Sequence, residues 1–309
     1  MSATATMGDQ GRRLSGSRRR RGGGLPPVLL AFILVPLLVE ATWVLWPAIQ
    51  GFYLSTLKWD GITSPEFVGS SNYRAMIHDP VFQTAFKNTI IWLVLFGGLS
   101  ILGGLGMAML LQRDRRGVSF YRSVLFLPVV LSMTAGALVW GVFLQPDGPA
   151  NQVLKLLGLG SFQHFWLADP KVALYSMTLP ALWRQIGYLM VLFIAGLKAI
   201  DPQLYEAARI DGASRWQEFR HITIPQLRSV NGVVIAVTII DALRSFDVVW
   251  ALTRGGPYHS TELLSTYMYS EAFQSRQLGY ASALAVVIFL LASAVIVTHL
   301  VRAFREDSD

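Results

Sequence analysis

The sequence contains no cysteine, which excludes disulfide bonds, thiolate metal ligands and a cysteine nucleophile. It also has no G-x-x-x-x-G-K-[ST] phosphate loop, no G-x-S-x-G nucleophile elbow and no H-E-x-x-H zinc pair. The histidines are scattered, and none form a pair with metal-ligand spacing (His78, His164, His221, His259 and His299). The sequence therefore offers no nucleophile, metal site or nucleotide-binding loop from which to argue catalysis.

Charge is also scarce. Only 15% of the 309 residues are charged, 53% are apolar, and the mean hydropathy is +0.45, which is too apolar for an ordinary soluble domain. The net charge of +7 does not indicate nucleic-acid binding, because the basic residues stand at the ends of apolar runs and not on one polar face. These features indicate an integral membrane protein.

Six apolar stretches are long enough to cross roughly 30 Å of hydrocarbon as helices. Backbone groups in a bilayer must be satisfied within the segment, and the runs are too long and unbroken for barrel strands. The sequence therefore predicts an all-α membrane protein with six transmembrane helices. They are expected at Val28–Ile49, Asn88–Leu111, Val124–Leu144, Val172–Leu197, Val230–Leu252 and Tyr280–Val301.

The distribution of Lys and Arg predicts the orientation. Seventeen lie on the side of the two termini, seven on the other side and two within spans. The positive-inside rule then places both termini in the cytoplasm. Residues 1–24, rich in Ser, Arg and Gly, are predicted to be a disordered basic cytoplasmic tail, and residues 25–309 the membrane domain. A cleaved signal peptide fits less well, because the apolar stretch is long and no A-x-A site follows it.

A cytoplasmic loop at residues 199–227 carries strong helix signals. Asp201 can cap a helix whose first residue is Pro202, where the missing N–H costs nothing. Gly212 can adopt the left-handed conformation that ends it. The loop is therefore expected to begin with a short helix and a tight turn.

A second short helix is expected after that turn. Ser214 and Gln217 form an S-x-x-Q capping box at its start. Pro225 is expected to end it, because proline cannot donate the next helical hydrogen bond. The prediction is a helix, a turn and a helix between the fourth and fifth spans.

The residues of this loop resemble the EAA signature, EAA-x3-G-x9-I-x-L-P, of permease subunits of binding-protein-dependent ABC importers. One position departs from it, since Ile224 stands where leucine is usual. The resemblance implies a type I importer permease fold and a loop that docks into a cleft of the ATPase subunit. The coupling residues it implies are Glu206, Ala207, Ala208 and Gly212.

Two further stretches resemble the carbohydrate-uptake branch of these permeases, the maltose and glycerol-phosphate type. The first comprises WDG at Trp59–Gly61 and residues 67–89. The second, residues 245–273, contains a T-x-G-G-P element ending at Pro257 and a later Tyr-x-Tyr. The glycines and proline are also expected to end the fifth span and begin an external turn.

Polar residues within the spans are candidates for the substrate path, because charge in a bilayer usually faces a cavity or a partner. The resemblance implies that an aromatic at the position of Tyr188 touches sugar and that Gln185 and Ser245 line the pocket. Asp241 and Arg244 stand three residues apart on one helical face, so a simple ion pair that holds the bundle together stays an equal alternative. The full candidate set is Arg184, Gln185, Tyr188, Asp241, Arg244 and Ser245.

The resulting hypothesis is a multi-pass permease of a bacterial inner membrane that imports a di- or oligosaccharide, or a glycerol-phosphate-like compound. Its expected partners are a second similar permease, two ATPase subunits and an extracytoplasmic sugar-binding protein. ATP and Mg²⁺ would bind to the ATPase subunits, and no cofactor is expected on this chain. An ion-coupled secondary transporter with Asp241 and Arg184 as relay residues is the alternative, and a membrane scaffold is a third.

Overall fold

The computed structural model describes residues 27–306. Helices dominate this part of the chain, as predicted, and its one sheet is a two-stranded antiparallel hairpin. The strands β1 (Leu57–Lys58) and β2 (Glu66–Phe67) pair Leu57 with Phe67 and Lys58 with Glu66. The predicted tail at residues 1–24 lies outside the described residues.

The chain divides into two compact units, residues 1–49 and 50–309. The described residues of the first unit form α1 (Pro27–Glu40), the π-helical segment η1 (Ala41–Leu45) and the start of α2 (Trp46–Leu54). Within these elements, Phe32–Leu54 is an apolar helix of 23 residues, which is long enough to cross a bilayer. The first predicted span is therefore a helix, with its end five residues beyond the predicted one.

Three long apolar helices of the second unit correspond to the second, fourth and sixth predicted spans. They are α4 (Pro80–Leu111), α9 (Thr178–Lys198), which continues the short α8 (Ala173–Ser176), and α16 (Leu278–Glu306). The helix α4 begins eight residues before the predicted start at Asn88, because the Asp79 side chain caps it and Pro80 opens its first turn. The polar residues of those extra turns had lowered the apolar signal.

The third and fifth predicted spans are not single helices. The third consists of α5 (Val118–Val130) and α6 (Met133–Phe143), which meet at 102°. The Ser132 side chain starts the second of them by accepting a hydrogen bond from Ala135 N at 3.1 Å. The fifth consists of α13 (Arg228–Leu243) and the short α14 (Asp247–Leu252), separated at residues 244–246. Local caps and turns thus divide two stretches that the sequence predicts as single helices.

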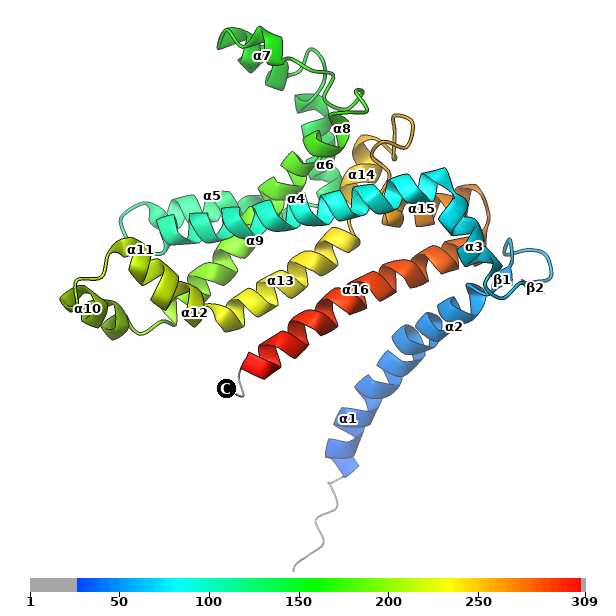
Figure 1. Ribbon diagram of the computed structural model, residues 1–309, viewed down its shortest axis with the longest axis horizontal. Coiled ribbons are helices and arrows are strands. Elements are labelled where there is room, and N and C mark those ends of the chain that lie inside the picture. Colours follow the sequence, from blue (N-terminus) through cyan, green and yellow to red (C-terminus); the bar gives the residue numbers. More distant parts are fainter. Residues whose placement is uncertain (1–26, 307–309) are drawn as a thin grey trace, which may run out of the picture. The chain divides into compact units, whose positions relative to one another are not determined.

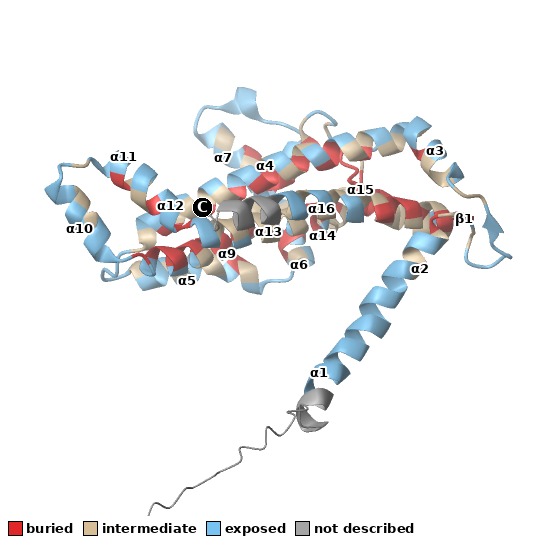
Figure 2. Cartoon of the chain, turned by 60° about the horizontal axis from the view of Figure 1, so that its bottom comes forward, coloured by how far each residue is buried: buried red, intermediate tan, exposed pale blue. Residues whose placement is uncertain are grey.

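Within the described residues, four helices are long and apolar enough to cross a membrane, or five if the bent α5–α6 pair is one span. The predicted number of six is not confirmed. The apolar surface agrees with a lipid environment, since α4 exposes Val94, Leu102 and Leu110 by 66–74%. Figure 2 shows buried residues on inner faces of the long helices of the second unit and exposed residues on their outer faces.

Small residues bring α4 and α9 into close contact. A side-chain carbon added at Gly104 would lie 2.6 Å from Cβ of Leu189, and one at Gly103 would lie 2.7 Å from Ile186. Gly98 and Gly106, by contrast, have no other atoms within 4 Å of such a carbon. The α4 glycines thus allow close helix packing at Gly103 and Gly104 but not at every position.

The two ends of the second unit are built from different short elements (Figure 1). One end carries α10 (Pro202–Ile210), α11 (Arg215–Glu218), the π-helical η3 (Phe219–Thr223) and α12 (Ile224–Gln226). The other carries the β1–β2 hairpin, α3 (Ser71–His78), α15 (Leu264–Tyr269) and the π-helical η4 (Ser270–Gln274). A separate arm after α6 contains α7 (Pro149–Leu156) and a short 3₁₀ turn, η2 (Gly160–Phe162).

Candidate functional site

A polar cavity of about 250 Å³ opens between α4, α6, α9, α13 and α14 of the second unit. Its lining combines charged, amide and hydroxyl groups with aromatic and apolar ones. The residues are Phe96, Met133, Ala181, Arg184, Gln185, Asp241, Arg244, Ser245, Phe246, Asp247 and Val248. Five of the six substrate-path candidates line this one cavity, although they come from positions up to 61 residues apart. Asp247, an ionisable residue of the fifth predicted span, lines it too, and so does Phe246, for which the sequence offers no functional indication.

The break between α13 and α14 builds one wall of the cavity. Ser245 Oγ donates to the Asp241 carbonyl at 2.8 Å, and the Trp92 indole Nε1 donates to that same Oγ at 3.0 Å. The Ser245 carbonyl, which lies outside both helices, accepts from Ser265 Oγ. Side chains thus satisfy the interrupted backbone, which is the condition for a break at membrane depth.

The two α9 residues in the cavity play different roles. Gln185 is buried, and its Nε2 donates to Asp241 Oδ2 at 3.0 Å. Arg184 has a buried Nε with no hydrogen-bond partner among the described residues. In that part of the chain no ion pair joins Asp241 to Arg244. The cavity therefore contains a donor that lacks an acceptor and a carboxylate that is held by a neutral amide.

Tyr188 lies about one turn further along α9 and does not line this cavity. It packs against the cluster that contains Leu189, Phe193 and Val234, between α4, α9 and α13. The structure thus separates Tyr188 from the other five candidates, and its contact with substrate stays a prediction.

At the α10 end, the hairpin predicted from the sequence is present. Asp201 caps α10 by accepting from Gln203 N at 2.9 Å, and Pro202 is its first residue. Gly212 has a left-handed backbone with φ of +80°, which favours glycine. The Ser214–Gln217 capping box starts α11. The first half of this loop therefore follows its sequence signals closely.

The sequence predicts that Pro225 ends the second helix, and this prediction is wrong. The chain stays helical through η3 and α12 and turns only at Leu227, directly before α13. Pro225 stands in the first turn of α12, where its missing N–H is tolerated. The loop is thus continuous with the following long helix.

An ion pair missed by the sequence analysis holds the hairpin closed. Arg209 Nε lies 2.8 Å from Glu218 Oε1, and the hydrogen bond from this guanidinium lowers the pKa of the Glu218 carboxyl. Tyr205 OH and Thr223 Oγ1 form a second link of 2.9 Å. No local pattern relates residues nine positions apart across a turn, so neither link had a sequence signal.

The implied coupling residues lie on the surface of this hairpin. Glu206, Ala207 and Gly212 are exposed and Ala208 is half-buried. Two apolar side chains beside them are also exposed, Ile210 by 86% and Trp216 by 65%. Figure 2 shows most of α10 and α11 as exposed. The hairpin therefore presents a mixed polar and apolar surface to a partner.

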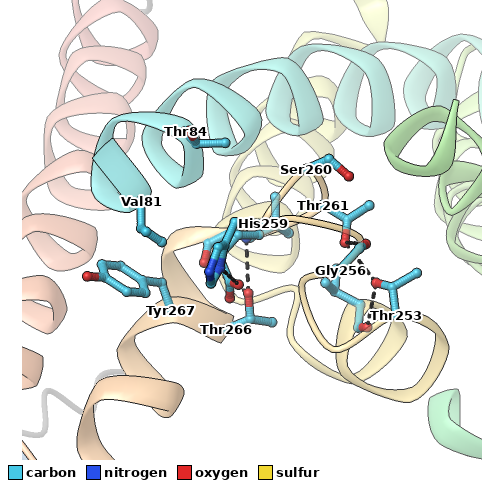
Figure 3. A network of polar contacts seen from close by, with 12 residues as sticks. Val81, Thr84, Thr253, Gly256, His259, Ser260, Thr261, Thr266 and Tyr267 are labelled. Atoms are coloured by element: carbon cyan, nitrogen blue, oxygen red, sulfur yellow. Dashed lines mark hydrogen bonds and ion pairs between the residues drawn. The ribbon is translucent and has the colours of Figure 1, made fainter. Parts of the chain in front are cut away.

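The T-x-G-G-P segment folds into a rigid loop at the other end (Figure 3). Thr253 Oγ1 and Thr261 Oγ1 are 2.8 Å apart, and Thr261 also donates to the Gly256 carbonyl. The buried Glu262 carboxylate packs against Gly255 and pairs with His259 Nδ1 at 3.1 Å. The predicted end of the helix and the turn after it are thus present; that this turn lies outside the cell stays a prediction.

Asn88 joins this loop to α4. Its Nδ2 donates to the carbonyls of Ser260 and Glu262 at 2.9 and 3.0 Å. Near the start of the same helix, the Asp79 carboxylate accepts from Tyr267 and Tyr280. Burial raises the pKa of Asp79, but the hydrogen bonds from Tyr267, Tyr280 and the backbone N–H groups of Val81 and Phe82 together outweigh it, and the net pKa is lowered.

Residues 100–306 match the model of the family described as "Binding-protein-dependent transport system inner membrane component". A probable ABC transporter permease protein of Pyrococcus horikoshii is 36% identical over 290 residues, which cover 93% of this chain and 99% of the relative. The chain belongs to this permease family. It is thus a multi-pass membrane component of an ABC transporter.

Other relatives of the permease include the diacetylchitobiose uptake system permease protein NgcF of Streptomyces coelicolor, 34% identical, with coverage of 84% of this chain and 77% of the relative. The permease's fold is similar to that of a chain of a bacterial ABC transporter involved in the import of the acidic polysaccharide alginate. The TM-score is 0.76 at 22% identity, and the match covers 90% and 95% of the two chains. The type I importer permease architecture is thereby supported, and the ion-coupled transporter and the scaffold lose their basis.

Proposed function

We propose that the permease imports a carbohydrate into the cell by alternating access, with the polar cavity as part of its substrate path. The observation that carries this proposal is the grouping of Arg184, Gln185, Asp241, Arg244 and Ser245 around one cavity. Arginine, carboxylate, amide and hydroxyl groups bind sugar hydroxyls, and the Phe96 and Phe246 rings offer apolar contact. No bond of the substrate is made or broken.

Relatives support the carbohydrate assignment. NgcF is named for diacetylchitobiose uptake, and MsmF of Streptococcus mutans, 32% identical over 87% of this chain and 92% of its own length, is a multiple sugar-binding transport system permease.

We propose that coupling to ATP occurs at the α10 hairpin, with Glu206, Ala207, Ala208 and Gly212 in contact with an ATPase subunit. The exposed surface of α10 beside Ile210 and Trp216 supports this, because a helix that docks in a groove needs uncovered apolar anchors. The partners would be a second permease, two ATPase subunits that bind ATP and Mg²⁺, and an extracytoplasmic binding protein. The assembly would lie in a bacterial inner membrane with both termini of this chain in the cytoplasm.

The test is substrate-stimulated ATP hydrolysis by the purified complex. Glu206→Lys and Gly212→Pro should each abolish stimulation, because the first reverses a contact charge and the second cannot adopt a positive φ. Glu66→Lys is the matched control, since it makes the same charge change in β2 at the opposite end of the second unit. Purification of the permease without an ATPase subunit, or normal stimulation in both Glu206→Lys and Gly212→Pro, would contradict the coupling proposal.

A further inference from the structure

The polar cavity contains four formal charges that sum to zero. Arg184 and Arg244 supply the positive ones, and Asp241 and Asp247 supply the negative ones. All other lining residues are uncharged. An occupant of this cavity therefore meets charges of both signs but no net charge.

Both carboxylates are open to an occupant of the cavity. Within the described part of the chain, neither Asp241 nor Asp247 forms an ion pair, and both residues are exposed to the cavity and its opening. Asp241 accepts from the neutral amide of Gln185. Asp247 is the first residue of the short helix α14. The two arginines and the two carboxylates are therefore not neutralised by direct pairing with one another.

Arg184 supplies the complementary observation. Its Nε is buried and lacks an acceptor, and a buried unpaired donor is costly until an occupant supplies an oxygen. A neutral hydroxyl or ring oxygen is sufficient for this. The buried donor thus favours an oxygen-rich occupant without requiring a charged one.

We propose that Asp241 and Asp247 make the cavity select uncharged saccharides and exclude sugar phosphates and uronic acids. This inference rests on the carbohydrate function proposed above. An anion that enters loses hydration, and the attraction of two arginines is cancelled by the repulsion of two carboxylates. A neutral sugar pays no such desolvation cost. The carboxylates therefore act against the wrong substrate class and add little affinity for the right one.

The experiment uses the purified complex in nanodiscs, without binding protein, so that only the membrane cavity selects. Sugar affinities are measured by saturation-transfer NMR for maltose, N,N′-diacetylchitobiose and the 6′-phosphate of each. The wild-type complex should bind at least one neutral sugar, and its phosphate at least about ten-fold more weakly. Import of the same neutral sugar into proteoliposomes that also contain binding protein is measured first.

The decisive variant is the Asp241→Asn and Asp247→Asn double substitution, which leaves both arginines unopposed. We expect the ratio of the affinity for the neutral sugar to the affinity for its phosphate to fall by about ten-fold or more. The affinity for the neutral sugar should be retained, which is the control for folding. Asp147→Asn is the control for the kind of substitution, because Asp147 lines a separate cavity of the α7 arm and the change removes one negative charge away from the polar cavity. It should leave the ratio unchanged.

Two outcomes would overturn this inference while leaving the carbohydrate function intact. One is equal wild-type binding of a sugar and its phosphate, and the other is an unchanged ratio of the two affinities in the double variant. If the wild-type complex neither imports nor binds any neutral sugar, the proposed function itself fails, and that result appears before any charged ligand is added.

Discussion

Gln185 and Asp241 join two long helices through one hydrogen bond of 3.0 Å, although they are 56 positions apart in the chain. The amide is buried, so its donor depends on this carboxylate for satisfaction. Gln185→Leu removes this hydrogen bond and should lower the unfolding temperature. The loss in the free energy of unfolding should be only about 1 kcal/mol, because water in the cavity can replace the amide at Asp241. Thermal unfolding of the complex measures it. Gln152→Leu, in the exposed part of α7, should have no comparable effect.

Gly187 faces the backbone of α5 so closely that no side chain fits. A Cβ there would lie 2.1 Å from the Leu125 carbonyl oxygen. Gly187→Ala should therefore destabilise the fold by about 1–3 kcal/mol or more, because backbone must move. Its controls are Gly98→Ala and Gly106→Ala, which have open space at Cβ and should be neutral or stabilising. Yield and unfolding temperature compare them, and equal behaviour of the three variants would contradict the close packing of α5 on α9.

Gly255→Ala combines two costs in the T-x-G-G-P loop. The residue has φ of +84°, and a Cβ would lie 2.0 Å from Glu262 Oε2. Gly158→Ala separates them, because Gly158 has φ of +75° but open space at Cβ. We expect about 1 kcal/mol from the backbone alone at Gly158 and a larger loss at Gly255. Hydrogen exchange of residues 253–263 in Gly255→Ala, and of the α7 arm in Gly158→Ala, would report the local openings.

The Arg209–Glu218 pair predicts a pH dependence of the α10 hairpin. Because the hydrogen bond from Arg209 lowers the folded-state pKa of Glu218 below its ordinary value of 4.5, the pair contributes stability above that value. This contribution is lost as the pH falls through the lowered pKa. Hydrogen exchange of α10 should therefore accelerate on acidification relative to Glu218→Gln at the same pH. A constant ratio between the two proteins from pH 6 to pH 3 would refute this contribution.

The absence of native cysteine makes the predicted orientation directly testable. Ser214→Cys at the α10 end should be protected from a membrane-impermeant maleimide in intact cells and react after permeabilisation. Ser70→Cys at the α3 end should react in both. The reverse pattern would show that the positive-inside assignment is wrong.

Local signals explain which parts of the structure the sequence predicts. Asp201, Pro202, Gly212 and Ser214 act on their own neighbours, so the first half of the coupling hairpin was foreseeable. The same holds for the three long helices α4, α9 and α16, which are apolar over most of their length. The early start of α4 needed only the cap at Asp79, which the apolar pattern does not register.

Nonlocal contacts explain what was missed. The break at Ser245 depends on Trp92 and Ser265, which are 153 and 20 positions away. The 102° bend after Val130 has a local element, the Ser132 cap, but a single serine does not stand out in a mostly apolar stretch. Five of the six candidate path residues nevertheless meet at one cavity, because an ionisable or amide group in an apolar span has few other places to lie.

The helix α4 is fixed at both of its ends. Asp79, its cap, is held by Tyr267 and Tyr280, and the carbonyl of its last residue, Leu111, accepts from Arg122 Nε at 2.8 Å. With 32 residues it measures about 48 Å at 1.5 Å per residue, well beyond the hydrocarbon thickness. A helix held at both ends moves as one body. A displacement of its Leu111 end, which lies toward the α10 hairpin (Figure 1), would therefore also move the loop that Asn88 holds.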